Sequence, residues 1–179
     1  FSRFPFGDIA DRLNLLSAAS AALTVGLTAF IIYQQLSTLP QVQPPPKEPF
    51  SSGLITGCAV SAGLTLAFAP TFWSQAVIAE VYTLNTLFAT LLLYGGLQLN
   101  PANQNWAAPA LFGLFGLSLG NHLSILLLLP LLILIFKARW CWRLFAVASL
   151  AFCFGLASYT MIPIRAAAMP PVNWGAAIT

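Results

Sequence analysis

Charged residues are scarce in this chain. It holds seven Lys or Arg and four Asp or Glu, so 6% of its residues are charged, whereas 59% are hydrophobic. A soluble domain is about 25% charged, which argues against a soluble protein and predicts several membrane spans. The basic residues are scattered without interleaved aromatics, so we expect no nucleic-acid partner.

Metal-ligand clusters and cofactor motifs are also missing. The single histidine, His122, stands apart from the few acids, and the three cysteines show no CxxC spacing and are expected to be buried as small apolar groups. No Ser/His/Asp set, phosphate-cradling glycine loop or pair of carboxylates occurs. We therefore expect no metal and no cofactor, and the residues alone name no reaction.

Long apolar runs alternate with polar or proline-rich breaks. A span takes about 20 apolar residues, fewer where a segment is broken or sheltered, and the prolines at 44–46 must lie in a loop. We predict an all-α fold, a polytopic transmembrane helical bundle forming a single domain over 1–179. The expected segments are 13–36, 52–69, 82–99, 106–119, 123–136 and 144–162. The short segments 106–119 and 123–136 form either a tight hairpin or a broken, buried helix pair.

The orientation follows from the basic cluster at 137–143, which is expected to be cytoplasmic. Counting spans from it places the stretch 72–80, the pair Asn121 and His122, and everything after 163 on the other side. The polar motifs therefore converge on the non-cytoplasmic face, as a site facing the periplasm or a lumen requires.

Glu80 is the only acid after residue 48, and it stands beside a bilayer-length apolar segment. A lone carboxylate there is costly unless it is paired or functional. It is either a snorkelling acid within an interfacial aromatic belt or a carboxylate paired with Arg165 or His122 in a polar vestibule. Tyr82 and Asn85 could share a helical face with it.

Four further residues are candidate ligands for substrate. Asn121 and His122 interrupt an apolar stretch and could hold a phosphate or a sugar hydroxyl, or could equally well satisfy backbone groups at a helix end. Arg165 offers a rigid fork of donors suited to phosphate, whether of a substrate or of lipid headgroups. Trp174, after Asn173, could stack on a sugar ring or anchor in the interface.

The start of the chain holds one more candidate, Arg12. It could pair with Asp8 or point at a lipid phosphate. Asp8 and Asp11 lie where carboxylates favour a helix N-terminus, so Asp8 is predicted to cap the first helix. The small residues at 18–22 suit close helix packing.

Several segments together resemble a known family. They are PFG at 5–7, RLNLLSA at 12–18, FWSQAVIAEVYTLN at 72–85, GNHLS at 120–124, PIR at 163–165 and NWG at 173–175. In this order they resemble mostly bacterial membrane proteins, formerly a domain-of-unknown-function family, that are similar to protein O-mannosyltransferases of the GT-C glycosyltransferase superfamily. The resemblance spans nearly the whole chain, and the segment 72–85 is its most specific part.

The resemblance implies a GT-C-like bundle in a bacterial inner membrane. Such an enzyme transfers a sugar from a polyprenyl-phosphate carrier to a hydroxyl of a protein or glycan acceptor on the periplasmic side. Its catalytic acid lies in the first external loop, and neither Asp8 nor Asp11 matches that motif. We therefore expect a fragment that lacks the first transmembrane helix and this loop and is inactive alone, with its catalytic residue unknown.

Charge type and shared sidedness suggest the roles of the candidate residues in such a reaction. Arg165, Arg12 and His122 are expected on the donor side, where they would hold the lipid phosphate, while Glu80, Tyr82 and Asn85 would shape the cavity or contact the acceptor. Asn121, Asn173 and Trp174 complete the expected substrate-binding set.

Two other classes stay open. A transporter or lipid flippase also uses short broken helices and a buried ionisable residue, although the charges at midplane and the internal repeat that it predicts are not visible in the sequence. A structural membrane subunit, whose polar residues only hold helices together, is the third alternative.

Overall fold

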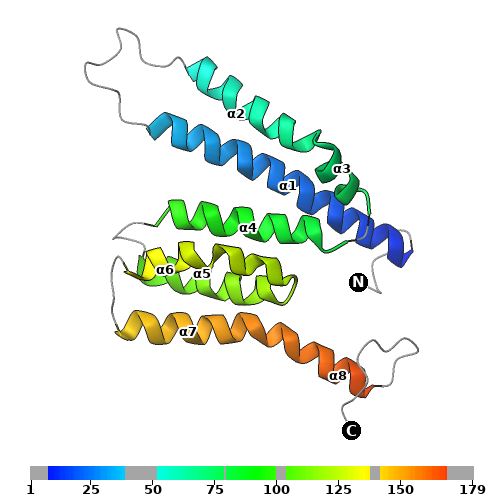
Figure 1. Ribbon diagram of the computed structural model, residues 1–179, viewed down its shortest axis with the longest axis vertical. Helices are drawn as coiled ribbons and strands as arrows, with labels where there is room; N and C mark the ends of the chain where they lie inside the picture. The colour runs from blue at the N-terminus through cyan, green and yellow to red at the C-terminus, as the bar shows by residue number, and fades with distance from the viewer. Residues whose placement is uncertain (1–7, 39–51, 79, 100–103, 138–141, 169–179) are drawn as a thin grey trace. The chain divides into compact units, whose positions relative to one another are not determined.

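The computed structural model describes residues 8–38, 52–78, 80–99, 104–137 and 142–168, and every regular element in them is a helix (Figure 1). The all-α class is therefore confirmed. The chain forms two compact units, residues 1–94 and 95–179. The elements are α1 (Ile9–Thr38), α2 (Ser52–Ala67), α3 (Pro70–Ala76), α4 (Tyr82–Leu97), α5 (Gln104–Leu119), the 3₁₀ helix η1 (Leu123–Leu128), α6 (Leu129–Lys137), α7 (Trp142–Leu156), the 3₁₀ helix η2 (Ala157–Thr160) and α8 (Met161–Ala167).

Two helices in the described ranges are long and apolar enough to cross a membrane. They are Ala10–Thr38 within α1 and the run Trp142–Ala167 that joins α7, η2 and α8. The pair α2 and α3 would make a third span if its bend is part of one crossing, and two apolar helices, Trp106–Leu119 and Leu123–Leu134, are shorter. The bundle of about six segments and the single domain over 1–179 stay predictions.

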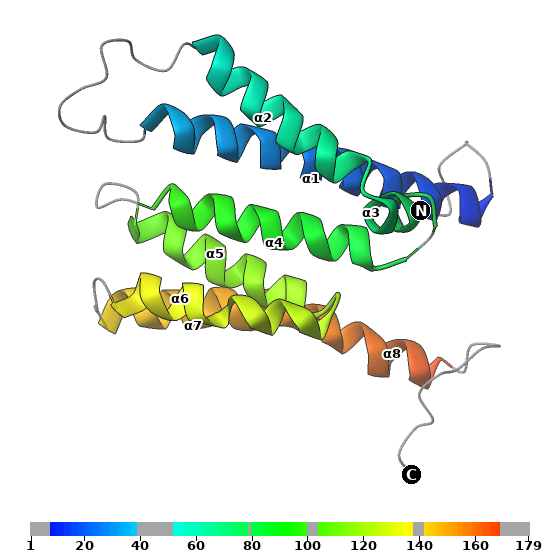
Figure 2. The ribbon, with the colours of Figure 1, turned by 45° about the horizontal axis from the view of Figure 1, so that its top comes forward.

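In the first unit, α2 runs back along α1 (Figure 2). The two backbones come close at Gly63, where an added Cβ would lie 3.1 Å from the Cβ of Ala29. The buried face of α1 is small and partly polar, and Thr24 Oγ1 satisfies its own hydrogen bond by donating to the Ser20 carbonyl at 2.8 Å. Small side chains let helices approach closely without a large apolar core. This buried face consists of Ser17, Ser20, Ala21 and Thr24.

A proline explains why α2 ends in a sharp bend. Pro70 disfavours helical geometry in the residue before it, and Ala69 is accordingly extended, with φ −61° and ψ 124°. Pro70 itself begins α3, since a proline is tolerated in the first turn of a helix. The helices α2 and α3 are bent by 66°, and the rings of Phe68 and Trp73 stack across the bend with centroids 6.1 Å apart. The sequence predicted only a connection here and missed α3.

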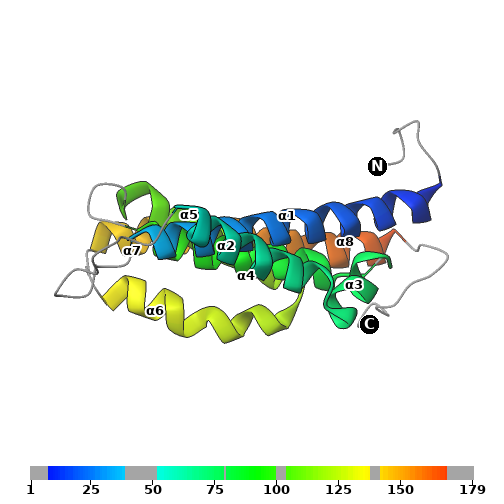
Figure 3. The same ribbon diagram turned by 90° about the horizontal axis from the view of Figure 1, so that it is seen from above.

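In the second unit, α5 and α7 pack in parallel. Gly155 of α7 lies against the Gly113 carbonyl of α5, and farther along the chain Gly120, just after α5, lies against Ser158 of η2. Because contact positions advance together in the two helices, the chain must return between them, and η1 with α6 forms that return (Figure 3). The segment 106–136 is thus two short helical runs of opposite direction.

Prolines also account for the two 3₁₀ helices. Pro130 in α6 has no N–H to donate to the carbonyl four residues earlier, and the Leu126 carbonyl instead accepts the Leu129 N–H. Pro163 in α8 is likewise preceded by η2. In both places the tighter i to i+3 pattern supplies bonds that a proline removes from the α-helical pattern.

Large apolar side chains lie mainly on the outside of the units. Leu127 and Phe154 are each 83% exposed, whereas Ala148 and Ser118 are completely buried. Cys58 and Cys153 are exposed free thiols, so the expectation that the cysteines are buried is wrong for these two. An interior of small residues beneath an apolar surface is typical of helices that face lipid.

We predict that Gly155→Ala destabilises the second unit, because the new methyl group would collide with the Gly113 carbonyl of α5. Overpacking of this kind costs about 1–3 kcal/mol. The matched control is Gly57→Ala in α2, where an added Cβ meets nothing within 4 Å and the loss of a helical glycine should leave stability unchanged or higher. Thermal unfolding in detergent measures both, and equal melting temperatures for the two variants would contradict the packing.

Candidate functional site

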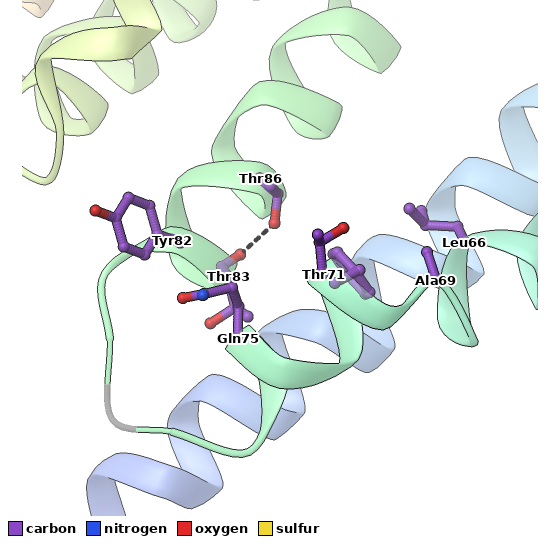
Figure 4. Close-up of a pocket in the computed structure, with 8 residues that line it drawn as sticks. Leu66, Ala69, Thr71, Gln75, Tyr82, Thr83 and Thr86 are labelled. Atoms are coloured by element: carbon purple, nitrogen blue, oxygen red, sulfur yellow. Dashed lines mark hydrogen bonds between the residues drawn. The ribbon is translucent and has the colours of Figure 1, made fainter.

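The first unit contains a pocket where the bend between α2 and α3 meets the start of α4 (Figure 4). Its volume is about 300 Å³. Three threonine hydroxyls, one amide and one phenol line it together with apolar groups. The lining residues are Leu66, Ala69, Thr71, Phe72, Gln75, Tyr82, Thr83 and Thr86.

Two polar side-chain atoms of this pocket have no hydrogen-bond partner within the described ranges. They are Gln75 Oε1 on α3 and Thr83 Oγ1 on α4, both buried, and the whole Thr83 residue is only 1% exposed. The neighbouring hydroxyl of Thr86 is already used, because it donates to the Thr83 carbonyl at 2.8 Å (Figure 4). Each unmade hydrogen bond of a buried group costs about 1–3 kcal/mol. An occupant that formed hydrogen bonds with these two atoms would therefore be stabilised in the pocket.

Glu80 lies in the link between α3 and α4, two residues before α4 begins at Tyr82. Its N–H donates to the Ile78 carbonyl at 2.9 Å, and its own carbonyl accepts from Ser17 Oγ of α1 at 3.3 Å. The sequence suggested that Glu80 could share a helical face with Tyr82. Glu80 lies before the helix, so it does not. It is exposed, and pairing with Arg165 or His122 stays a prediction because both belong to the other unit.

The other candidates of the first unit lie near this link. Tyr82 is 46% exposed and lines the pocket. Asn85 follows it one turn later on α4, half-buried, with its N–H bonded to the Val81 carbonyl at 3.0 Å. Arg12 lies on α1 about 7.5 Å along the axis from Ser17, at a rise of about 1.5 Å per residue, and so at the end of α1 that contacts the Glu80 link.

The capping of α1 is as predicted, and it is reciprocal. Asp8 Oδ1 accepts the Asp11 N–H at 3.0 Å, and Asp11 Oδ2 accepts the Asp8 N–H at 3.1 Å. This arrangement satisfies backbone donors in the way of a capping box. Asp8 and Asp11 thus have a structural role at the start of the helix that carries Arg12.

In the second unit, His122 caps η1. Its Nδ1 accepts the Ser124 N–H at 3.1 Å and lies 2.8 Å from Ser124 Oγ. The backbone N–H groups of Asn121 and His122 both donate to the Ser118 carbonyl at the end of α5. Of the two roles considered for this pair, the satisfaction of backbone groups is visible, and the binding role stays a prediction.

His122 and Arg165 lie toward the same end of the second unit. Tyr159 Oη donates to the Leu119 carbonyl at 2.8 Å, which joins the end of α5 to η2. Arg165 is exposed in the last turn of α8, one to two turns beyond Tyr159. Arg143 begins the same helical run, about 33 Å away at a rise of about 1.5 Å per residue. That separation resembles the hydrocarbon thickness of about 30 Å.

Two predicted residues, Asn173 and Trp174, lie outside the described residues. Within the ranges that are described, no group of three or more His, Cys, Asp or Glu residues could hold a metal ion. The polar atoms that gather in a pocket belong to uncharged side chains.

The family described as the Protein O-mannosyl-transferase TMEM260 N-terminal domain matches residues 1–144. The chain belongs to this family. The match includes the pocket, the Glu80 link, Arg12 and His122, while Arg165 lies beyond it. The match thus covers the first unit in full and α5, η1 and α6 of the second.

A mouse (Mus musculus) relative, Protein O-mannosyl-transferase TMEM260, is 29% identical in an alignment 171 residues long that covers 90% of this chain. The chain spans 22% of the length of that relative. No solved structure matches the chain. The comparisons therefore confirm that the chain belongs to an O-mannosyltransferase-like family. A bacterial origin and membership of the GT-C superfamily stay predictions.

Sequence reasoning missed Gln75 and Thr83. Both stand in the segment 72–85, in which the predicted site residues are Glu80, Tyr82 and Asn85. The available signal was spacing, because Thr71 with Gln75 and Thr83 with Thr86 each place two polar groups on one helical face. Their burial depends on the bend at Pro70 and on the packing of separate helices, which local sequence patterns do not predict.

We predict that His122→Ala destabilises the second unit by about 0.5–2 kcal/mol, the usual cost of a lost helix cap. His122→Asn should retain most of the stability, because asparagine also accepts a backbone N–H at this position. Thermal unfolding compares the two variants. If asparagine proved as damaging as alanine, the cap would not be the role that matters.

Proposed function

We propose that this chain is part of a membrane glycosyltransferase of the GT-C type. It would transfer a sugar from a polyprenyl-phosphate donor to a hydroxyl of a protein or glycan acceptor on the non-cytoplasmic face, which is the periplasm if the membrane is a bacterial inner membrane. The family match over residues 1–144 carries the proposal. A relative of the chain is named a protein O-mannosyl-transferase, and mannose is therefore the first sugar to test.

Such a transfer needs one set of residues that act on the acceptor and another set that act on the donor. A carboxylate acting as general base would take the proton of the acceptor hydroxyl, and neither Asp8 nor Asp11 is assigned this role. Cationic and polar donors would stabilise the departing lipid phosphate. Arg165, Arg12 and His122 are the donor-side residues, although the His122 Nδ1 already accepts from Ser124.

The acceptor side would be formed by Glu80, Tyr82 and Asn85. Support comes from the first unit, where the Glu80 link contacts α1 and Tyr82 and Asn85 follow it on α4. Glu80 is exposed, as a group that contacts an acceptor must be. Its role would be to orient the acceptor chain or to attract a hydrogen-bond donor from it.

The side of the membrane that the site faces is inferred from two arginines at opposite ends of one helical run. Arg143 belongs to the basic cluster that favours the cytoplasm, and Arg165 ends the same helical run about 33 Å away at about 1.5 Å per residue. The uncharged stretch between them is long enough for one crossing. His122 shares the Arg165 end of its unit, so both would face the non-cytoplasmic side.

We predict that Arg165→Ala in the complete protein lowers transfer from polyprenyl-phosphate mannose to an acceptor peptide by about ten- to a hundredfold, since a hydrogen bond to a charged group contributes about 1.5–3 kcal/mol. Glu80→Ala should also lower transfer, through weaker acceptor binding. The matched control is Arg143→Ala, which removes the same charge at the opposite end of the helix and should leave turnover unchanged.

Unchanged turnover in both Arg165→Ala and Glu80→Ala would sink this assignment of the site. A protein that moves the lipid-linked sugar across vesicles without transferring the sugar would instead support the transporter alternative. A complete protein with neither activity would favour the structural subunit. Radiolabelled mannose followed in the peptide and in the lipid fraction separates these results.

A further inference from the structure

We propose that the pocket between α2, α3 and α4 binds the uncharged sugar ring of the donor rather than its phosphate or its lipid chain. The inference rests on the proposed function and adds to it where the sugar lies. The pocket lies in the unit that the family match covers completely. Its polar groups come from α3 and from the start of α4 (Figure 4).

A phosphate does not suit this lining. None of the eight lining residues carries a formal charge, whereas phosphate binding in proteins relies on Arg, Lys or a set of backbone N–H groups. The charged candidates lie elsewhere, with Arg12 on the first turn of α1 and Arg165 in the other unit. A phosphate transferred from water into this pocket would lose solvation without a counter-charge.

Most of the accessible lining is apolar, but a hydrocarbon chain placed there would leave two buried polar atoms unpaired. Thr83 Oγ1 and Gln75 Oε1 are buried without partners in the described residues, and an isoprenoid chain has no donor to offer them. A sugar carries several hydroxyl groups, each of which donates one hydrogen bond and accepts others. An occupant with several hydroxyl groups can pair with both atoms and so remove this cost.

The remaining walls fit the apolar face of a sugar. Phe72, Leu66 and Ala69 supply aromatic and aliphatic surface beside the polar groups, and aromatic rings are common partners of amphipathic ligands. The volume of about 300 Å³ lies at the lower end of small-molecule pockets, which start at about 300 Å³. It exceeds by about tenfold the space of one water molecule, so a single solvent molecule does not fill it.

The test is Thr83→Val, a substitution of nearly equal shape that removes the hydroxyl. The complete protein in detergent is titrated with two probes, polyprenyl-phosphate mannose and the same polyprenyl phosphate without a sugar. We expect Thr83→Val to weaken binding of the mannose-bearing probe about two- to tenfold, as for one hydrogen bond, and to leave the sugarless probe unaffected. Gln75→Met should act in the same direction.

The matched control is Thr90→Val on the same helix, because Thr90 Oγ1 bonds to the Thr86 carbonyl at 2.8 Å and Thr90 does not line the pocket. It should leave both affinities unchanged. The melting temperature without ligand adds a second readout, since Thr83→Val removes an unpaired buried hydroxyl and should hold or raise stability. A variant that bound sugar less well only because it was misfolded would instead melt earlier.

Three results overturn the inference. Equal weakening of both probes would place lipid or phosphate in the pocket, and unchanged affinities in Thr83→Val and Gln75→Met would remove the sugar from it. In either case, mannose transfer by the unmodified protein would leave the proposed function standing. If the unmodified protein bound neither probe and transferred no mannose, the proposed function would fail together with the inference.

Discussion

Pro70 cannot donate the backbone hydrogen bond that would continue α2, and its ring holds Ala69 in an extended conformation. The bend of 66° that results turns α3 across the end of α1. With α3 in that position, Gln75 comes to line the same pocket as Thr83 of α4, and the following link brings the Glu80 carbonyl to Ser17. The pocket and the Glu80 link both depend on this one break in a helix.

The units themselves are held by close approach of backbones. Gly63 admits α1 beside α2, and Gly155 with Gly113 admits α7 beside α5. Large side chains such as Phe154 are left on the surface. Between helices in lipid, dispersion contacts of this kind replace the hydrophobic effect as the source of association. A rigid scaffold built in this way can leave polar groups such as Thr83 without partners.

Much of the helical content could be predicted from apolar runs and breakers. The segment 52–69 corresponds to α2, which ends at Ala67, and the segment 82–99 corresponds to α4, which begins at Tyr82. The cap at Asp8 was also predictable, because it depends on residues three apart. These features depend on residues close together in the sequence, so apolar runs and capping residues are enough to predict them.

The rest depended on contacts between distant residues. The polar and aromatic sequence of α3 has no apolar run, so its helix was missed, and Glu80 was placed on a helix that starts two residues later. The parallel packing of α5 and α7 follows from glycine contacts about 40 residues apart in sequence. Thr83 gave no sign of its burial, which arises only when the helices assemble.

The central claim is that the pocket at the bend opens to the non-cytoplasmic face and binds the donor. The most direct measurement replaces the native cysteines, introduces Thr71→Cys in the exposed part of the lining, and follows reaction with a membrane-impermeant maleimide. The account predicts labelling from the non-cytoplasmic side, slowed by polyprenyl-phosphate mannose. Labelling from the cytoplasmic side alone would contradict it.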